Sequence, residues 1–109
     1  MNIIIAGDGK AGYTLAERLS QDADNRITII DTDLDALSAT AEAIDVRVVN
    51  GSAVDIHTLK DAGIVRADLF IATTDSDERN MLACLIAKNS ARPTPSREPA
   101  NRVTTKAWR

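Results

Sequence analysis

The junction between residues 3–6 and 7–12 constrains the fold most, because the apolar run IIIA leads directly into GDGKAG. Four consecutive apolar residues, mostly β-branched, are typical of a parallel strand that is covered on both faces. The glycines after them form a Gly-x-Gly-x-x-Gly pattern, and Lys10 to about Gln21 carries apolar residues at helical spacing. A strand, a glycine turn and a helix in this order predict the first unit of a doubly wound α/β fold.

Short apolar runs and helical patterns continue to alternate as far as residue 88. They predict strands at 27–30, 46–49 and 69–72 and helices at 34–44, 55–62 and 76–88. Successive strand–helix units imply right-handed crossovers and a parallel sheet with helices on both faces. The sequence therefore predicts a Rossmann-like α/β domain over residues 1–89, with strand order 3-2-1-4.

This pattern stops at Asn89. Residues 90–109 hold all three prolines, and their five Lys and Arg against one Glu give a balance of +4. Only Val103 and Trp108 are large and apolar there. We expect a Pro-rich basic tail that is disordered or atypical, because prolines break regular helices and so few apolar residues bury little surface.

Composition and charge narrow the classes of function. With 109 residues the chain has room for one domain, and residues 1–89 hold 8 Lys and Arg against 15 Asp and Glu, a balance of −7. A body of this sign repels a phosphate backbone, so we expect no nucleic-acid partner. No stretch approaches the roughly 20 apolar residues of a membrane span. The N-terminus also lacks the basic and apolar regions of a secretion signal.

The single cysteine and the single histidine suggest neither catalysis nor metal binding. Cys84 excludes an internal disulfide, suits a reducing cytoplasm, and falls within an apolar helix where a buried, inert thiol is expected. His57 has no partner cysteine or second histidine for a metal site. We therefore predict no catalytic residue and no metal ligand.

The glycine loop predicts a seat for a diphosphate. Gly7 permits the tight turn out of the strand, Gly9 removes a side chain where a pyrophosphate approaches the backbone, and Gly12 lets the helix lie close to the sheet. The helix N-terminus adds free N–H groups and about half a positive charge. A strand–helix turn without a ligand is the alternative.

Asp31 ends the second predicted strand, 19 positions after Gly12. An acid at about this offset accepts hydrogen bonds from ribose hydroxyls. It also repels a 2′-phosphate, and no Lys or Arg stands at positions 32–35 to neutralise it. We therefore expect NAD(H) or ATP/ADP, with a free 2′-hydroxyl, and not NADP. Alternatively, Asp31 caps the next helix, although Asp33 is better placed to do so.

Two charged residues stand inside the glycine loop. Asp8 brings a carboxylate to a phosphate site, so we expect its side chain to point away from the pyrophosphate. Lys10 is either a phosphate partner or a solvent-facing lysine. A methyltransferase, which carries an acid just before the first glycine, is disfavoured because Ala6 stands there.

Residues 46–88, VRVVNGSAVDIHTLKDAGIVRADLFIATTDSDERNMLACLIAK, extend the pattern beyond the glycine loop. Together with IIIAGDGKAGYTLAERL and ITIIDTD, they resemble the RCK/KTN (TrkA-N) family of nucleotide-binding domains that regulate potassium conductance. The resemblance covers residues 2–88. Its most specific pieces are Gly51-Ser52-Ala53, LKDAGI and ATTDSDERNMLACLIAK.

The resemblance implies a site over the carboxyl ends of the strands. Residues 7–11 would hold the pyrophosphate, Asp31 the adenosine ribose, the turn after strand three the adenine side, and the turn after strand four the second nucleotide half. The candidate residues are Gly7, Asp8, Gly9, Lys10, Ala11, Gly12, Asp31, Thr32, Asp33, Gly51, Ser52, Ala53, Thr73, Thr74, Asp75 and Asn80. Turn and cap chemistry is the alternative for the last group, with Asp75 or Ser76 capping the fourth helix.

The resemblance also implies a function without substrate chemistry. Members of the family are cytoplasmic, lie beneath the inner face of the cell membrane, and pair into dimers or rings of dimers. They serve a membrane potassium transporter or channel, and nucleotide binding changes potassium flux. A fragment of an NAD-dependent oxidoreductase is the alternative function, and a bare scaffold without a working glycine loop is a third.

After Lys88 the chain departs from the family pattern, which continues into a fifth strand and then another helix and strand. We expect the sheet to be truncated before strands five and six, which would leave strand four at an edge. The chain is then either cut short with foreign sequence appended, or its reading frame ends abnormally.

Overall fold

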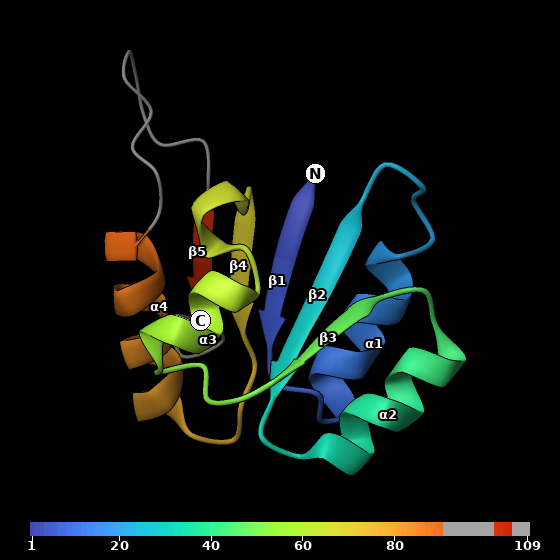
Figure 1. Ribbon diagram of the computed structural model, residues 1–109, viewed down its shortest axis with the longest axis horizontal. Helices are drawn as coiled ribbons and strands as arrows, with labels where there is room; N and C mark the ends of the chain where they lie inside the picture. Colours follow the sequence, from blue (N-terminus) through green and yellow to red (C-terminus); the bar gives the residue numbers. More distant parts are fainter. Residues whose placement is uncertain (91–101, 106–109) are drawn as a thin grey trace.

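The computed structural model describes residues 1–90 and 102–105. The predicted strands and helices are all present in the predicted order, with a short 3-10 helix, η1, in addition (Figure 1). The elements are β1 (Asn2–Ala6), α1 (Lys10–Leu19), β2 (Arg26–Asp31), α2 (Leu34–Ala43), β3 (Arg47–Asn50), α3 (Ile56–Asp61), η1 (Ile64–Arg66), β4 (Leu69–Ala72), α4 (Asp77–Ser90) and β5 (Arg102–Thr105).

The strands form one parallel sheet in the order β3-β2-β1-β4-β5. The predicted order 3-2-1-4 is confirmed. The change of direction after β1 places the carboxyl ends of β1 and β4 beside each other, which is the position where open α/β sheets bind ligands.

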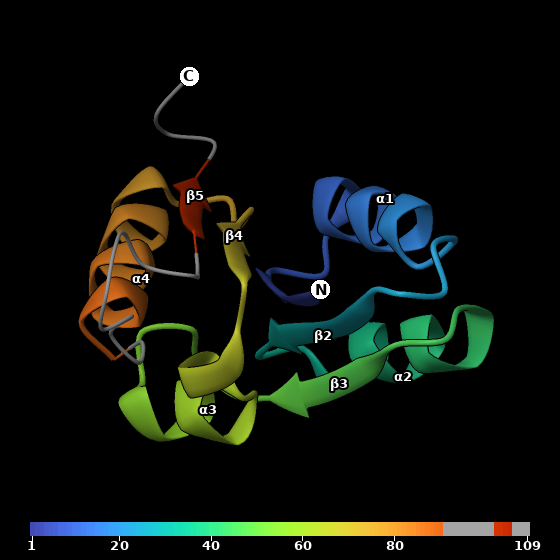
Figure 2. The same cartoon turned by 90° about the horizontal axis from the view of Figure 1, so that it is seen from above.

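Helices cover both faces of the sheet (Figure 2). Successive residues of β1 point to opposite faces, as the pleat requires. Ile3 and Ile5 pack in one apolar cluster with Ala16 of α1 and Leu37 of α2. The intervening residues of β1 pack in the other cluster, which contains Leu59 of α3 and Ala83, Cys84 and Ala87 of α4. This two-sided burial explains the continuous apolar run at the start of the chain.

The structure corrects the prediction at the sheet edge beside β4. Arg102–Thr105 form β5, and Phe70 and Ile71 of β4 stand opposite Val103 and Thr104. The signal was present, because Val103, Thr104 and Thr105 are consecutive β-branched residues, but the preceding prolines outweighed it. A fifth strand therefore follows β4, which is not an edge strand. The rest of the predicted tail, residues 91–101 and 106–109, lies outside the described residues.

The start of α2 and the end of α3 are formed by the residues that the sequence indicates. The Asp33 carboxylate caps α2 by accepting from the backbone N–H groups of Asp35 and Ala36, at 3.0 and 3.2 Å. Gly63, after α3, has φ +90°, the left-handed conformation expected at a helix end. Across residues 1–90 and 102–105, none of the helices has both the length and the apolar character needed to cross a membrane.

Candidate functional site

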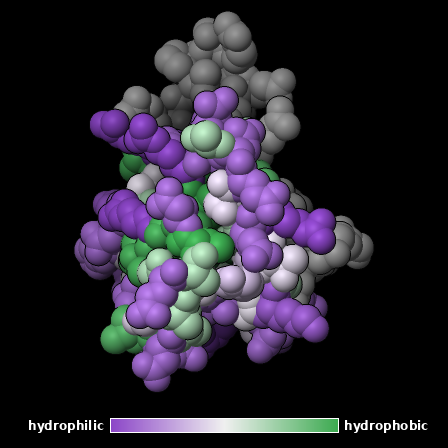
Figure 3. Space-filling view, turned by 90° about the vertical axis from the view of Figure 1, so that its right-hand side faces the viewer, coloured by the Kyte–Doolittle hydropathy of each residue, from purple (hydrophilic) through white to green (hydrophobic). Residues whose placement is uncertain are grey.

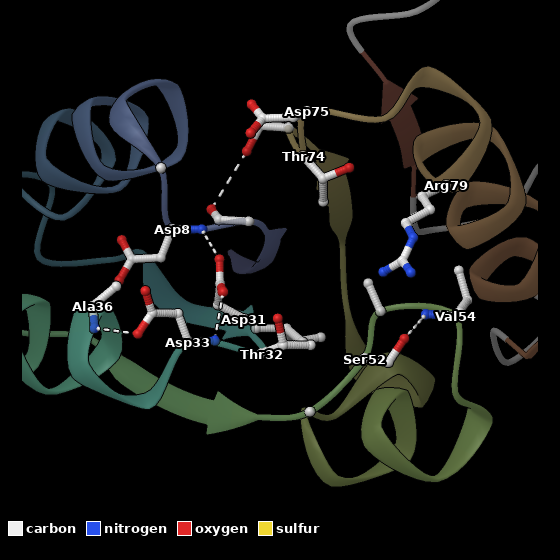
Figure 4. Close-up of a pocket in the computed structure, with 16 residues that line it drawn as sticks. Asp8, Asp31, Thr32, Asp33, Ala36, Ser52, Val54, Thr74, Asp75 and Arg79 are labelled. Carbon is white, nitrogen blue, oxygen red and sulfur yellow. Dashed lines mark hydrogen bonds between the residues drawn. The ribbon is translucent and has the colours of Figure 1, made fainter.

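A pocket of about 260 Å³ lies at the carboxyl ends of β1, β2, β3 and β4 (Figure 4). The turns after these strands supply its walls. From the predicted set it brings together Gly7, Asp8, Gly9, Asp31, Thr32, Asp33, Gly51, Ser52, Ala53, Thr73, Thr74 and Asp75. Sequence reasoning missed four further lining residues, Ile30, Ala36, Val54 and Arg79.

Gly7 and Gly12 are required by the protein itself. Gly7 has φ +116°, and a Cβ there would lie 2.9 Å from the Thr73 hydroxyl oxygen. A Cβ on Gly12 would overlap the carbonyl oxygen of Gly7. These contacts agree with the predicted roles of a tight turn and a close helix–sheet approach.

Gly9 is not required by the protein. Its φ is −81°, which any residue adopts, and a Cβ there would meet no atom within 4 Å. Gly9 is also the N-cap of α1, and no side chain caps this helix end. The absence of a side chain at Gly9 therefore keeps open the space beside the uncapped helix N-terminus.

Asp31 is held in the pocket by the two segments on either side of it. One carboxylate oxygen accepts from the Asp8 backbone N–H at 2.7 Å, and the other accepts from the Asp33 N–H at 2.8 Å. Each oxygen keeps lone pairs for a further donor. Asp33, rather than Asp31, caps α2. The carboxylate is thus oriented and still able to accept hydrogen bonds from a diol.

Asp8 lies on the same wall, and its side chain turns away from the centre of the pocket, toward α2 (Figure 4). It is 8% exposed, and its Oδ2 accepts from the Thr40 hydroxyl at 2.6 Å. Oδ1 is buried without a hydrogen-bond partner in the described part of the chain. Burial raises the pKa of this carboxyl above 3.8; the Thr40 bond opposes the rise, and the charges of Asp31 and Asp33 add to it.

Asn80 organises the wall that follows β4. It is fully buried, and its amide accepts from the Thr74 N–H at 3.0 Å and donates to the Thr74 carbonyl at 3.1 Å. Ser76 caps α4 by accepting from the Arg79 N–H at 3.2 Å. Asn80 therefore fixes the turn that carries Thr73, Thr74 and Asp75, and does not line the pocket itself.

The loop after β3 is tied to the end of β2. The Gly51 N–H and the Asn50 side-chain amide both donate to the Asp31 carbonyl, at 2.9 and 3.0 Å. A Cβ on Gly51 would lie 2.5 Å from the Thr58 hydroxyl oxygen, so the glycine allows α3 to approach. Ser52 accepts from the Val54 N–H at 3.2 Å, which shapes the turn facing the pocket.

Three other predicted residues lie outside the pocket lining. Lys10 and Ala11 are exposed in the first turn of α1, and Gly12 is buried beneath it. Lys10 therefore stands at the helix start without lining the pocket.

Arg79 contributes the one Lys or Arg side chain among the lining residues that the structure describes. It lies in the first turn of α4, across the pocket from Asp31 (Figure 4). Its position could have been inferred from the sequence, because the first turn of a helix after a strand faces the carboxyl edge of the sheet.

Comparison with known proteins finds a matching family and similar relatives. The model of the TrkA-N domain family matches residues 3–101. The Trk system potassium uptake protein TrkA of Halomonas elongata is 42% identical over 104 residues, which are 95% of this chain and 22% of that protein. The chain thus spans about a fifth of the length of this relative.

Two solved structures share the fold. The TrkA-N domain of the inner membrane protein ybaL from Escherichia coli aligns with a TM-score of 0.76 at 21% identity, covering 95% of this chain and 70% of that chain. The GsuK channel bound to NAD aligns with a TM-score of 0.71 at 26% identity, covering 84% of this chain and 17% of that chain. Since the family model also spans the glycine loop, Asp31 and the turn after β4, the chain belongs to the TrkA-N domain family.

Proposed function

We propose that this chain is the nucleotide-binding regulatory domain of a potassium uptake system, that it binds NAD(H) or ATP/ADP, and that binding gates potassium transport through a membrane partner. One observation carries the proposal: the uncapped N-terminus of α1 and the Asp31 carboxylate border the same pocket. The relative named TrkA and the NAD-bound channel structure support it.

Each part of such a ligand can be paired with a group of residues that line the pocket. The diphosphate fits the open space at Gly9, where backbone N–H groups carry partial positive charge. The ribose diol fits Asp31, whose oxygens are already oriented by two backbone donors. The base then extends toward Thr32 and the loop of Ser52 and Ala53, and the second half of a dinucleotide meets the turn after β4.

The proposed activity is regulatory rather than catalytic. A ligand changes a conformational equilibrium only through unequal affinity for the two states. In this proposal the domain acts in the cytoplasm, at the inner face of the cell membrane, as a dimer or ring of dimers. An NAD-dependent oxidoreductase fragment is the competing function, and steady oxidation of NADH with candidate carbonyl substrates would favour it.

Calorimetry tests the nucleotide assignment. Wild type is expected to bind at least one of NAD⁺, NADH, ADP and ATP, and to bind NADP⁺ more weakly than NAD⁺ because the 2′-phosphate meets the Asp31 charge. Asp31→Ala should weaken binding about tenfold or more, since hydrogen bonds to a charged group contribute roughly 1.5–3 kcal/mol each. Asp24→Ala, an exposed change outside the pocket lining, is the control. Equal or tighter binding of NADP⁺ by wild type would contradict the role of Asp31.

A further inference from the structure

Arg79 lines the pocket but has no role in the proposed function as stated so far. Four acidic residues border the pocket, Asp8, Asp31, Asp33 and Asp75, and Arg79 is the one basic residue among the lining residues that the structure describes. No hydrogen bond or ion pair within residues 1–90 and 102–105 engages its guanidinium, whereas its backbone N–H is used in capping α4. The side chain is exposed at the rim of the pocket and available to a ligand.

The Arg79 side chain lies on the side of the pocket opposite the expected position of the diphosphate. Figure 4 shows the guanidinium on the same side of the pocket as Ser52 and Val54, across from Asp8 and Asp31. The diphosphate is expected at Gly9 and the ribose at Asp31, both on the opposite wall. The group that reaches the side of Ser52 and Val54 is then the base attached to that ribose.

We propose that Arg79 lays its guanidinium plane on the adenine ring of the bound nucleotide, and so is a specificity-determining residue for adenine ligands. This inference rests on the proposed function. A planar guanidinium stacks on aromatic faces, and an ammonium group cannot replace its plane. Ala53 and Val54 supply apolar surface on the same side, which suits an aromatic base better than a phosphate.

The test compares AMP, ADP, ATP and NAD⁺ by calorimetry on wild type, Arg79→Ala, Arg79→Lys and Arg79→Tyr. If Arg79 stacks on the base, Arg79→Ala weakens all adenine ligands by a similar factor of about 3 to 30. Arg79→Lys stays weak although it keeps the charge, and Arg79→Tyr recovers affinity because it keeps a planar face. Arg18→Ala, in the last turn of α1 and outside the pocket lining, is the matched control.

A phosphate contact would give a different set of results. The loss would grow from AMP to ATP, would shrink as salt is raised, and would be repaired by Arg79→Lys, and any of these would overturn the stacking role. Wild-type affinity in Arg79→Ala would overturn it as well. If wild type bound none of the four nucleotides, the proposed function would fail, and this inference with it.

Discussion

At the scale of single residues, Gly9 is a position where an added side chain is expected to weaken ligand binding without disturbing the fold. Because a Cβ at Gly9 meets no protein atom within 4 Å, Gly9→Ala should change the free energy of unfolding by less than about 0.5 kcal/mol. The same methyl group stands where the diphosphate is expected, so nucleotide affinity should fall about tenfold or more. Urea unfolding and calorimetry measure the two effects.

Gly12→Ala is the matched comparison for Gly9→Ala. A Cβ at Gly12 overlaps the Gly7 carbonyl oxygen, so this variant should lose about 1–3 kcal/mol of stability whether or not a nucleotide is present. A Gly12→Ala protein as stable as wild type would show that α1 does not pack on the sheet as described. A Gly9→Ala protein with unchanged affinity would remove the diphosphate from the glycine loop.

Asp8 gives a prediction with a definite sign against pH. Its pKa is raised in the folded state, so the folded protein holds a proton that the unfolded chain releases near pH 3.8. The contribution of Asp8 to stability is therefore largest below that pH and is lost as pH rises through the raised folded pKa. Asp8→Asn has no charge to bury and should therefore be more stable than wild type at neutral pH.

Urea unfolding of wild type and Asp8→Asn at a series of pH values measures this difference. The stability of the variant relative to wild type should rise with pH across the acid range and then level off. Asp24→Asn, an exposed change, is the control. A difference that falls as pH rises would contradict the buried, partly orphaned carboxyl described for Asp8.

At the scale of elements, α4 exposes an apolar surface. Met81, Leu82 and Leu85 are 52%, 47% and 57% exposed and lie within about one turn of each other. The opposite side of the molecule, which carries α1 and α2, is mostly hydrophilic around an apolar area of its own (Figure 3). If copies of the domain pair through α4, Leu85→Lys should shift the protein toward monomers in sedimentation without unfolding it.

Leu34→Lys is the control for this prediction, since Leu34 is 59% exposed at the start of α2, and α2 and α4 pack in different apolar clusters on the two faces of the sheet. An unchanged sedimentation profile for Leu85→Lys would place the pairing surface elsewhere.

Elements with strong local signals could be predicted from the sequence, and elements that depend on distant contacts could not. Residues 3–6 predict a strand and Asp33 predicts a helix start, and each prediction needs only a few neighbouring residues. β5 was missed because its four residues depend on pairing with β4. Arg79 was missed because helical periodicity alone gives no sign of a binding role, although its place in the first turn after β4 indicates the carboxyl edge of the sheet. Most of the lining was predictable, since parallel strands bring their following turns to one edge.

At the scale of the whole molecule, ligand binding should appear as stability. A nucleotide that binds only the folded state adds about 2.7 kcal/mol when present at 100 times its Kd. Thermal unfolding with and without NAD⁺ or ADP should therefore show a higher Tm with ligand, which returns to its starting value on dialysis. Asp31→Ala should reduce the increase. The same Tm at saturating concentrations of every candidate nucleotide would mean that the folded domain has no preference for them.

The two backbone hydrogen bonds that the Asp31 carboxylate accepts have a mechanical consequence. The same carboxylate restrains the backbone of the loop that precedes α1 and the backbone of the turn that precedes α2. Both segments lead into helices that pack in the same apolar cluster on one face of the sheet. A sugar bound at Asp31 would therefore touch the one side chain that is tied to the starts of both helices.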